Sequence, residues 1–453
     1  MKFSEKLTKA KHLIRMSPGI RGKIGTARQL VLVAGRSHQA RKPPVTAETV
    51  AANAWADYHL LRLVSRDINV RIERNGVPRV WFVVPELNAK IIFGGYIALF
   101  QFIKFIQDLG LQTGVLALNT LPGHTELLKS FESNNLAHRV LSQARIGSVG
   151  VGRTVRLGSG DMLVSYNWTS SLIAARMARF LDDPCYYYFV QEDERIFYSN
   201  DSYRFLCESV FHQEPRPRLI CNSQKLYEHF LSQGLARSDG IAGVFEQGLP
   251  SAELPDRDSL SRRSPRRFVF YGRPEDHAKR NLMTIALLAI AKSKRDRAFD
   301  AEPWEFFMIG SSQMGEDFDL EGTRITCLPN QGYEAYRRTL ATFDVGMCLM
   351  YAPHPSVPPF EMVRSGVITV VNATRARPAE WYRGISRNFE PAEPTVEALS
   401  AAIGRAAARV GDADARLAQV ETYHPKSWEA SFSHLPRVLG HKIFDGVLQE
   451  KSE

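Results

Sequence analysis

Cysteine and long apolar runs are both scarce in this chain of 453 residues. The five cysteines are scattered and form no CxxC pair, which excludes the common zinc and dithiol motifs and suits reduced core residues. The longest apolar candidate, residues 91–106, is interrupted by two glycines, Gln101 and Lys104, so no run of about 18 apolar residues indicates a spanning helix. The amino terminus also lacks the apolar region of a signal peptide. We therefore expect a cytoplasmic protein.

Metal-binding signatures are missing as well. There is no HxxxH pair, and Asp317 and Asp319 stand in a polar, hairpin-like loop away from the other motifs. The acidic run of residues 192–194 is the remaining place where a divalent ion would find carboxylates. We expect no metal and no other cofactor.

Positive charge is unevenly distributed. The formal net charge is +10, which indicates an anionic partner such as a nucleotide diphosphate, an acidic membrane or a nucleic acid. Residues 1–45 carry eleven Lys or Arg and one Glu, with apolar residues at helical spacing in the first fourteen positions. This pattern predicts a basic amphipathic helix that lies on an anionic bilayer, where each basic residue contributes about 1 kcal/mol. The alternative is a solvated basic leader.

The length suits two domains, and the apolar pattern divides the chain accordingly. After the leader and a polar, helix-leaning stretch, strands are expected at 80–87, 115–118, 161–166, 186–190 and 218–222, with helices between them. The polar segment 251–266 is the predicted linker, and strands and helices alternate again over 267–425. This alternation predicts two doubly wound α/β domains, 46–250 and 267–425. Residues 426–453 are expected to form a helix that packs back on the first domain.

Three loops of the first half carry candidate binding residues. Gly94 and Gly95 precede a helix expected from residue 96, where a loop brings its backbone close to a ligand; a plain turn is the alternative. Strand ends lead into Asn167 with Trp168 and into Gln191 with Asp193, and we expect these four side chains to bind an acceptor through its hydroxyl groups. For the segment with Gln191 and Asp193, an ordinary exposed loop is the alternative.

A basic loop opens the second half. Arg273, Lys279 and Arg280 lie between the strand at 267–271 and a helix expected from residue 281, where the helix dipole already favours an anion. A basic surface loop would look the same, so this motif gains weight from a second one about eighty residues later.

The second motif is YAPHPSVPPFEMVRSG at residues 351–366, between apolar strands at 343–350 and 367–372. Its prolines stiffen a loop, and Pro358 or Pro359 suits the first position of a short helix that ends at Gly366. Glu361, in the first turn, is placed to accept hydrogen bonds from a vicinal diol such as a ribose. Alternatively, the segment is a proline-stiffened loop with a capping Glu, or a polyproline ligand for a partner domain.

The string PPFEMVRSGVITVV resembles the donor-binding segment of retaining nucleotide-sugar glycosyltransferases of the GT-B fold. The longer string PHPSVPPFEM is similar to bacterial polysaccharide rhamnosyltransferases of the S-layer glycan type, which use dTDP-rhamnose. The resemblance implies two Rossmann-like domains facing across a cleft, with Pro359, Phe360 and Glu361 at the donor.

The same resemblance assigns further residues. It implies that Arg273 and Lys279, or Arg280 in place of Lys279, hold the departing diphosphate, and that Gly94 and Gly95 face the donor. The family pattern has another Glu eight residues before the ribose-binding one, and Pro353 stands there. His354 and Ser356 are the nearest polar replacements, with His354 as a catalytic candidate.

Together these features predict a retaining, metal-independent hexosyltransferase that moves a sugar, rhamnose by the narrower resemblance, onto a surface polysaccharide or lipid-linked glycan. Its partners are then the nucleotide sugar, the glycan acceptor and an anionic membrane surface at the inner face, with no nucleic acid. The alternatives are a GT-B nucleotide-sugar epimerase, a phosphorylase, or a basic adaptor that binds a membrane or polyanion without activity.

Overall fold

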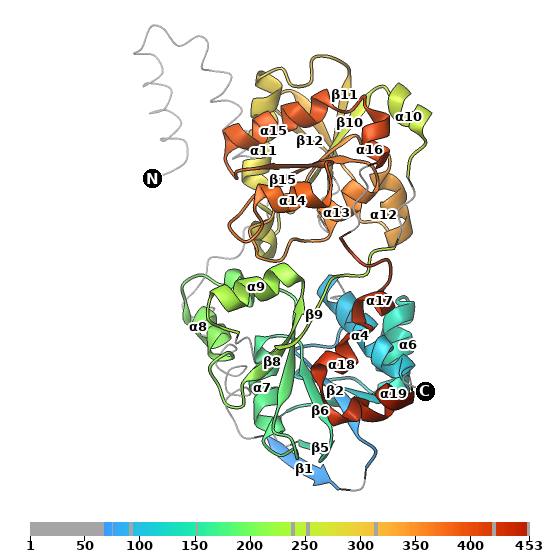
Figure 1. The fold of residues 1–453 in the computed structure, drawn as a ribbon, viewed down its shortest axis with the longest axis vertical. Coiled ribbons are helices and arrows are strands. Elements are labelled where there is room, and N and C mark those ends of the chain that lie inside the picture. The colour runs from blue at the N-terminus through green and yellow to red at the C-terminus, as the bar shows by residue number, and fades with distance from the viewer. Residues whose placement is uncertain are drawn as a thin grey trace, which may run out of the picture. The chain divides into compact units, whose positions relative to one another are not determined.

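The computed structural model describes residues 68–450, except 75, 90–93, 151–152, 237–240, 251–253, 312–315 and 419–422. The basic leader and most of the polar stretch after it therefore lie outside the described residues. Residues 66–453 group into one unit, and Figure 1 shows two α/β lobes within it.

The first lobe is built on a sheet of seven parallel strands. Across the sheet their order is β4 (Arg145–Ser148), β3 (Gln112–Ala117), β2 (Arg79–Val84), β6 (Met162–Ser165), β7 (Tyr186–Val190), β8 (Pro217–Asn222) and β9 (Ile241–Phe245). A separate parallel pair, β1 (Asn69–Glu73) with β5 (Thr154–Gly158), was not predicted.

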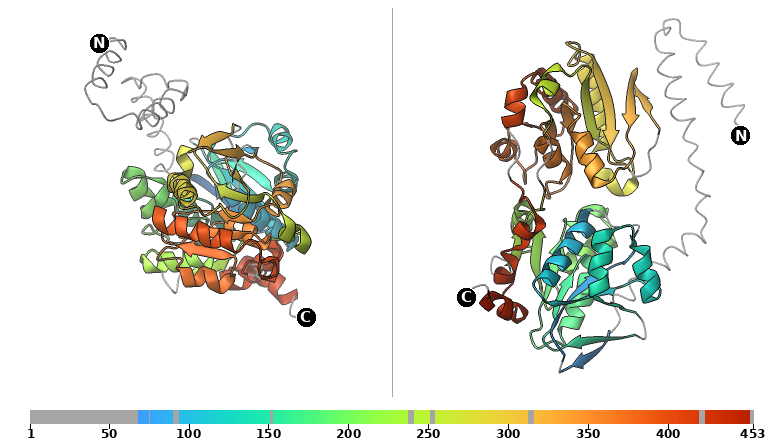
Figure 2. Two further views of the ribbon diagram at one scale, coloured as in Figure 1. Left: turned by 90° about the horizontal axis from the view of Figure 1, so that it is seen from above. Right: turned by 90° about the vertical axis from the view of Figure 1, so that its right-hand side faces the viewer.

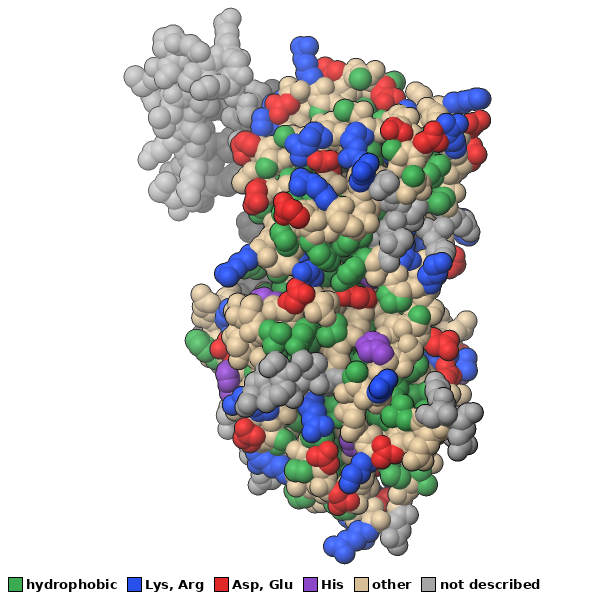
Figure 3. Space-filling view, viewed as in Figure 1, with side chains coloured by type: hydrophobic (Ala, Val, Ile, Leu, Met, Phe, Trp, Pro, Cys, Tyr) green, Lys and Arg blue, Asp and Glu red, His purple; other side chains and the backbone are tan. Residues whose placement is uncertain are grey.

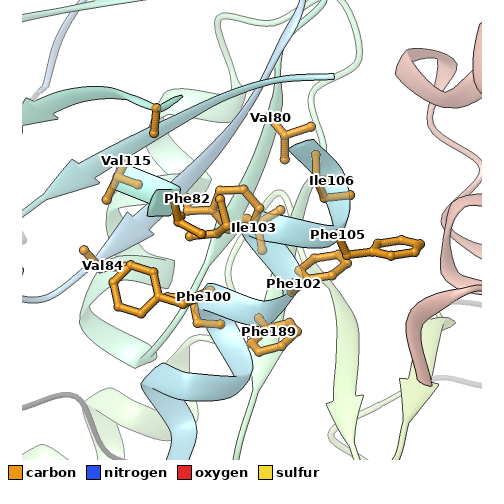
Figure 4. Packing of buried hydrophobic residues seen from close by; sticks show 14 of the residues in the cluster. Val80, Phe82, Val84, Phe100, Phe102, Ile103, Phe105, Ile106, Val115 and Phe189 are labelled. Carbon is orange, nitrogen blue, oxygen red and sulfur yellow. The ribbon is translucent and has the colours of Figure 1, made fainter. Parts of the chain in front are cut away.

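The core of this lobe forms because β2 presents alternate residues to one face of the sheet. Val80, Phe82 and Val84 pack against helix α4 (Gly94–Asp108), as Figure 4 shows. The rings of Phe102 and Phe189 stack at 5.2 Å between centroids. This packing fixes α4, and with it the loop that enters the helix.

The second lobe has its own seven-stranded sheet. The order is β12 (Phe318–Leu320), β13 (Thr323–Cys327), β11 (Trp304–Ile309), β10 (Arg266–Tyr271), β14 (Val345–Met347), β15 (Ile368–Asn372) and β16 (Phe389–Ala392), and all pairs are parallel except β12 with β13. Helices α11 (Met283–Arg295) and α15 (Val396–Ala408) share a core with one face, while α12 (Tyr333–Leu340) and α13 (Pro358–Arg364) cover the other (Figure 2).

Shorter helices complete the two lobes. They are α5 (His124–Ser130), α6 (Asn135–Gln143), α7 (Trp168–Ala178), α8 (Ser202–Ser209), α9 (Gln224–Ser232), α10 (Arg257–Arg262), α14 (Ala379–Ile385) and α16 (Ala413–Ala418), with 3₁₀ helices η2 (Glu194–Phe197), η3 (Asp276–Asn281) and η4 (Lys442–Phe444). No described helix is long and apolar enough to cross a bilayer.

The carboxyl-terminal helices return to the first lobe. From α17 (Trp428–Phe432) and α18 (Leu435–Leu439), Phe432, Leu435 and Leu439 join the same apolar cluster as β2. The last helix, α19, covers Asp445–Glu450. The chain thus crosses between the lobes twice, and Leu249 N–H donates to Pro425 C=O (2.8 Å) where the two crossings run side by side.

Two local features differ from the expected secondary structure. Gly94 and Gly95 are not in a loop before the helix but form its first turn. The segment 251–266, predicted as a linker, contains the unpredicted helix α10; Asp256 caps this helix by accepting a hydrogen bond from Ser259 N–H (2.9 Å), and Leu260 is buried. The sequence did not predict this helix because Leu260 is its one apolar residue, so the segment has no apolar period.

Each sheet has one point where the strand order reverses. In the first sheet it falls between β2 and β6, and in the second between β10 and β14. Open α/β sheets bind ligands beyond the carboxyl ends of the strands at such points. The segments that follow these four strands contain the first turn of α4 with its Gly94 pair, Asn167, the basic motif and the proline motif.

Candidate active site

Two arginines meet at the switch point of the second sheet. Arg273 follows the end of β10, and its Nε lies 3.8 Å from Glu275 Oε2. Arg280, near the end of η3, has a pKa lowered by burial and by the charge of Arg273, partly offset by Glu192. Lys279 is exposed instead. Of the two residues predicted to accompany Arg273, Arg280 is therefore the one that interacts with other charged groups. The neighbouring guanidinium groups of Arg273 and Arg280 make this place favourable for binding an anion.

Glu361 occupies the first turn of α13, whose first two positions are prolines. Its carboxylate accepts hydrogen bonds from the hydroxyl groups of Tyr333 and Tyr336 on α12. Burial raises the pKa of Glu361 to about 7, although these two bonds act in the opposite direction. The sequence analysis did not select either tyrosine, and they reach Glu361 only because α12 packs beside α13 in the fold.

Pro359 and Phe360, predicted at the donor, lie in the first turn of α13. Both are buried, and Phe360 packs edge-on against Phe389 and His424, with ring centroids 5.2 and 4.4 Å away. The packing of Phe360 anchors α13 to its neighbours, and the donor contacts of both residues stay predictions.

The loop between β14 and α13 is fixed by buried polar side chains. Asn372 exchanges two hydrogen bonds with the backbone of Met350, at 2.7 and 3.1 Å, and Arg377 donates to Met350 C=O at 2.7 Å. Further along, Ser356 N–H donates to His354 Nδ1 at 3.0 Å, with Ser356 in the left-handed region at φ 64°. Local side-chain bonds of this kind hold such a conformation in place.

His354 is neutral in this setting. Burial, with the nearby His424, Arg377 and Arg280, lowers its pKa to about 3. Because Nδ1 accepts the bond from Ser356, the ring proton sits on Nε2. His354 therefore offers a hydrogen bond to a ligand but no charge at neutral pH.

One carboxyl group of the first lobe reaches this loop. Glu192 Oε1 accepts from Asp193 N–H at 2.9 Å, and the carboxylate also accepts from the backbone N–H of His354. Beside it, the Arg280 guanidinium lies over the ring of Phe197 at 4.9 Å. Glu192, which the sequence analysis considered only as part of an acidic run for a divalent ion, thus joins the two lobes at the basic loop.

An uncharged polar cluster lies at the carboxyl ends of β7 and β8 in the first sheet, next to the switch point. Asn222 Nδ2 donates to Gln191 Oε1 at 2.9 Å, while the buried Asn222 Oδ1 and Gln191 Nε2 have no hydrogen-bond partner within the described structure. Gly95 packs so closely here that a Cβ would lie 2.5 Å from Tyr166 Oη and 3.4 Å from Gln191 Cγ. Of the predicted acceptor residues, Gln191 is therefore the one that offers an open amide.

The other three predicted acceptor residues have structural bonds. Asp193 is buried and pairs with Arg195 and His229, each at 2.9 Å, which lowers its pKa. Trp168 is buried, and its Nε1 donates to Tyr198 Oη at 2.9 Å. Asn167 caps α7 through a bond from Ser170 N–H at 3.0 Å. The carboxylate of Asp193 is thus engaged by Arg195 and His229, and its acceptor-binding role stays a prediction.

Within the described part of the chain, no group of three His, Cys, Asp or Glu side chains is placed to hold a metal ion. In the acidic run 192–194 the carboxyl groups diverge, since Glu194 accepts from Trp168 N–H at 2.8 Å and from Tyr188.

The fold resembles solved structures of the GT-B class at low sequence identity. The crystal structure of TarM aligns with a TM-score of 0.52 and 8% identity, over 84% of this chain and 99% of that one. An α,α-trehalose-phosphate synthase (UDP-forming) from Burkholderia xenovorans aligns with a TM-score of 0.50 and 10% identity, over 80% and 100%. The predicted fold, α/β with two doubly wound Rossmann-like domains of the GT-B type, is confirmed.

The sequence comparisons are more specific for the second lobe. Residues 266–404 match the family model described as WsaF, C-terminal domain. The O-antigen biosynthesis protein RfbC of Myxococcus xanthus is 29% identical over 304 residues, which cover 65% of this chain and 22% of that protein. The chain thus spans about a fifth of the length of this relative. The matched family segment contains both the basic loop and the proline motif.

Proposed function

We propose that this protein is a glycosyltransferase of polysaccharide biosynthesis, which moves a sugar from a nucleotide-sugar donor to a growing surface polysaccharide or a lipid-linked glycan. The GT-B fold, the WsaF C-terminal match and the O-antigen relative all support this class. The observation that carries the proposal is the arrangement at the second switch point, where paired arginines and a tyrosine-bound Glu361 flank the ends of β10 and β14.

In this proposal Arg273 and Arg280 bind the diphosphate, and Glu361 accepts from a hydroxyl of the nucleoside sugar. As the bond between the anomeric carbon and the diphosphate oxygen breaks, negative charge grows on the departing group. Fixed guanidinium groups stabilise that charge without reorganising. Lys279 is exposed, and in this scheme it attracts the donor from solution rather than binding it closely.

The finer assignments rest on the resemblance of the proline motif. We propose dTDP-rhamnose as donor, and transfer with retention in which the acceptor hydroxyl attacks from the face that the diphosphate leaves. The acceptor oxygen then bonds to the anomeric carbon, and its proton passes to the departing phosphate oxygen. Positive charge from the arginines would serve without a metal ion. His354 Nε2–H and the Ser356 hydroxyl are the proposed contacts to the transferred sugar.

The basic leader adds a proposal about location. Its eleven basic residues and one acidic residue give a net charge equal to the +10 of the whole chain. On the face in Figure 3, by contrast, positive and negative side chains of the described residues are interspersed. We propose that the leader holds the enzyme on an anionic membrane, where lipid-linked acceptors are found.

A thermal-shift panel of nucleoside diphosphates and their sugars tests the function, because a ligand that binds the native state raises the melting temperature. We expect a diphosphate to stabilise the protein, dTDP most strongly, and expect Glu361→Ala and Arg273→Ala to lose most of that shift. Arg295→Ala is the matched control, since Arg295 is exposed on α11 and forms a surface ion pair with Glu321.

Two results would contradict this function. Equal shifts and equal turnover in wild type, Glu361→Ala and Arg273→Ala would remove the assigned site. Isomerisation of the free nucleotide sugar without transfer would identify an epimerase instead.

A further inference from the structure

Glu192 contacts the basic loop from the opposite lobe. The residue follows β7 by two positions and is 9% exposed. One of its oxygens accepts from Asp193 N–H at 2.9 Å, and the carboxyl group also accepts from the backbone N–H of His354. Two main-chain donors from different lobes therefore fix the orientation of this carboxyl group.

Arg280 is the charged group that faces Glu192 from the second lobe. Its guanidinium lies 4.9 Å over Phe197, which belongs to the same lobe as Glu192, and its backbone C=O accepts from Tyr351 N–H at 2.7 Å. Arg280 is thus held at its backbone by the proline loop and at its side chain by the first lobe. An anion bound at Arg280 would compete with an ionised Glu192 for the same positive charge.

We infer that Glu192 is a positioning residue for the donor diphosphate: its protonated form releases Arg280 to the diphosphate, and its ionised form holds Arg280 across the lobes. This inference rests on the proposed function. At a pH above the pKa of Glu192, binding of the diphosphate then takes up one proton from solvent, which protonates the Glu192 carboxylate. This is because an ionised carboxylate and a bound diphosphate would repel each other.

The direction of the pH dependence follows from the surroundings. Burial raises the pKa of Glu192 to about 8, and the charge of Asp193 adds to this, while the two backbone bonds and Arg280 act against it. The neutral acid therefore predominates at pH 7 and the carboxylate at pH 9. If only the protonated form binds, affinity for a diphosphate falls about tenfold between pH 7 and pH 9 through this one group.

Isothermal titration of the full chain with dTDP and UDP tests this linkage. At pH 8 and pH 9, titrations in two buffers of different ionisation enthalpy give the number of protons taken up on binding. The nucleotide's own terminal phosphate, with a second pKa near 6, is fully ionised in this range. We expect uptake of about half a proton at pH 8 and nearly one at pH 9.

Glu192→Gln keeps the shape and the acceptor oxygen, and should bind with no such proton uptake and with affinity that stays level from pH 8 to pH 9. Glu194→Gln is the control: Glu194 also has a raised pKa, of about 7, but bonds to Trp168 and Tyr188 within the first lobe. This control should keep the wild-type uptake. Arg280→Lys, a second variant that retains charge, should bind more weakly and take up fewer protons than wild type.

The outcomes separate the two claims. If wild type binds neither nucleotide, the proposed function is wrong, and the inference about Glu192, which depends on it, is wrong as well. If wild type binds but takes up no proton at pH 9, or if Glu192→Gln takes up as much as wild type, the inference about Glu192 is overturned and the proposed function stands.

Discussion

The contact between Gly95 and Tyr166 makes one variant pair especially informative. Alanine at Gly95 would place its Cβ 2.5 Å from Tyr166 Oη, whereas alanine at Gly94 would meet nothing within 4 Å. Both glycines lie in the first turn of α4, so both substitutions gain the same helix preference, up to about 1 kcal/mol. Tyr166 cannot move freely, because its ring packs against Tyr96 at 4.6 Å between centroids.

The expected difference between the two variants follows from that overlap. Forcing a methyl group into a packed site costs about 1–3 kcal/mol, so Gly95→Ala should be less stable than Gly94→Ala by that amount. For a lobe of this size each kcal/mol lowers the melting temperature by about 2–4 °C.

Thermal denaturation followed by circular dichroism measures this difference, and turnover assays add a second readout. Gly95→Ala should lose activity, since Tyr166 must shift beside Gln191, while nucleotide binding at the other lobe stays as in wild type. Equal melting temperatures and equal turnover for the two alanine variants would refute the close approach of α4 to the strand ends.

Three further predictions concern other parts of the chain. Arg364 donates hydrogen bonds to the carbonyls of Leu249, Pro250 (3.2 Å) and His424 (2.7 Å). In urea unfolding, Arg364→Ala should therefore lower the free energy of unfolding by about 3–5 kcal/mol, and Arg364→Lys by less. Unchanged unfolding midpoints would contradict a stabilising role for these bonds. Burial raises the pKa of Glu194 to about 7, so the contribution of its neutral form to stability is complete below pH 4.5 and is lost as pH rises through 7. Glu194→Gln should therefore melt several degrees above wild type at pH 8.5 and at the same temperature as wild type at pH 4.5. A difference in melting temperature that does not change with pH would argue against a buried neutral acid. The predicted leader helix carries Lys2, Lys6, Lys9 and Lys11. Replacing these four lysines with Gln should lower the affinity for anionic vesicles at low salt, measured by co-sedimentation, by more than tenfold and leave nucleotide binding unchanged. Equal co-sedimentation of variant and wild type would contradict a membrane role for this segment.

The sequence predicted the architecture well because the apolar strands are long and buried. Runs such as RVWFVV in β2 and YYYFV in β7 leave little choice of structure, and both became central strands. The short edge strands β4 and β12 and the six-residue helix α10 were missed, since each has few apolar residues and is stabilised by neighbours distant in sequence.

The candidate site was predictable at the level of loops. Parallel topology brings the loops after β10 and β14 together, so the basic motif and the proline motif were expected to meet. Which side chain faces the site was not predictable. Lys279 and Arg280 are adjacent in a 3₁₀ helix, where one residue turns the side chain by about a third of a turn.

Residues that act through tertiary bonds were beyond sequence reasoning. Asp193 and Glu192 are neighbours at a strand end, yet Asp193 bonds to Arg195 and His229 while Glu192 bonds across the lobes. No local pattern separates the two roles, because the partners are set by how the loop folds.

A crystal structure of the protein with the nucleoside diphosphate that stabilises it most would test the central claim directly. The account predicts density for the diphosphate at Arg273 and Arg280, with the nucleoside sugar within hydrogen-bond distance of Glu361. Nucleotide density at any other place, with Arg273, Arg280 and Glu361 unchanged from their present contacts, would contradict it.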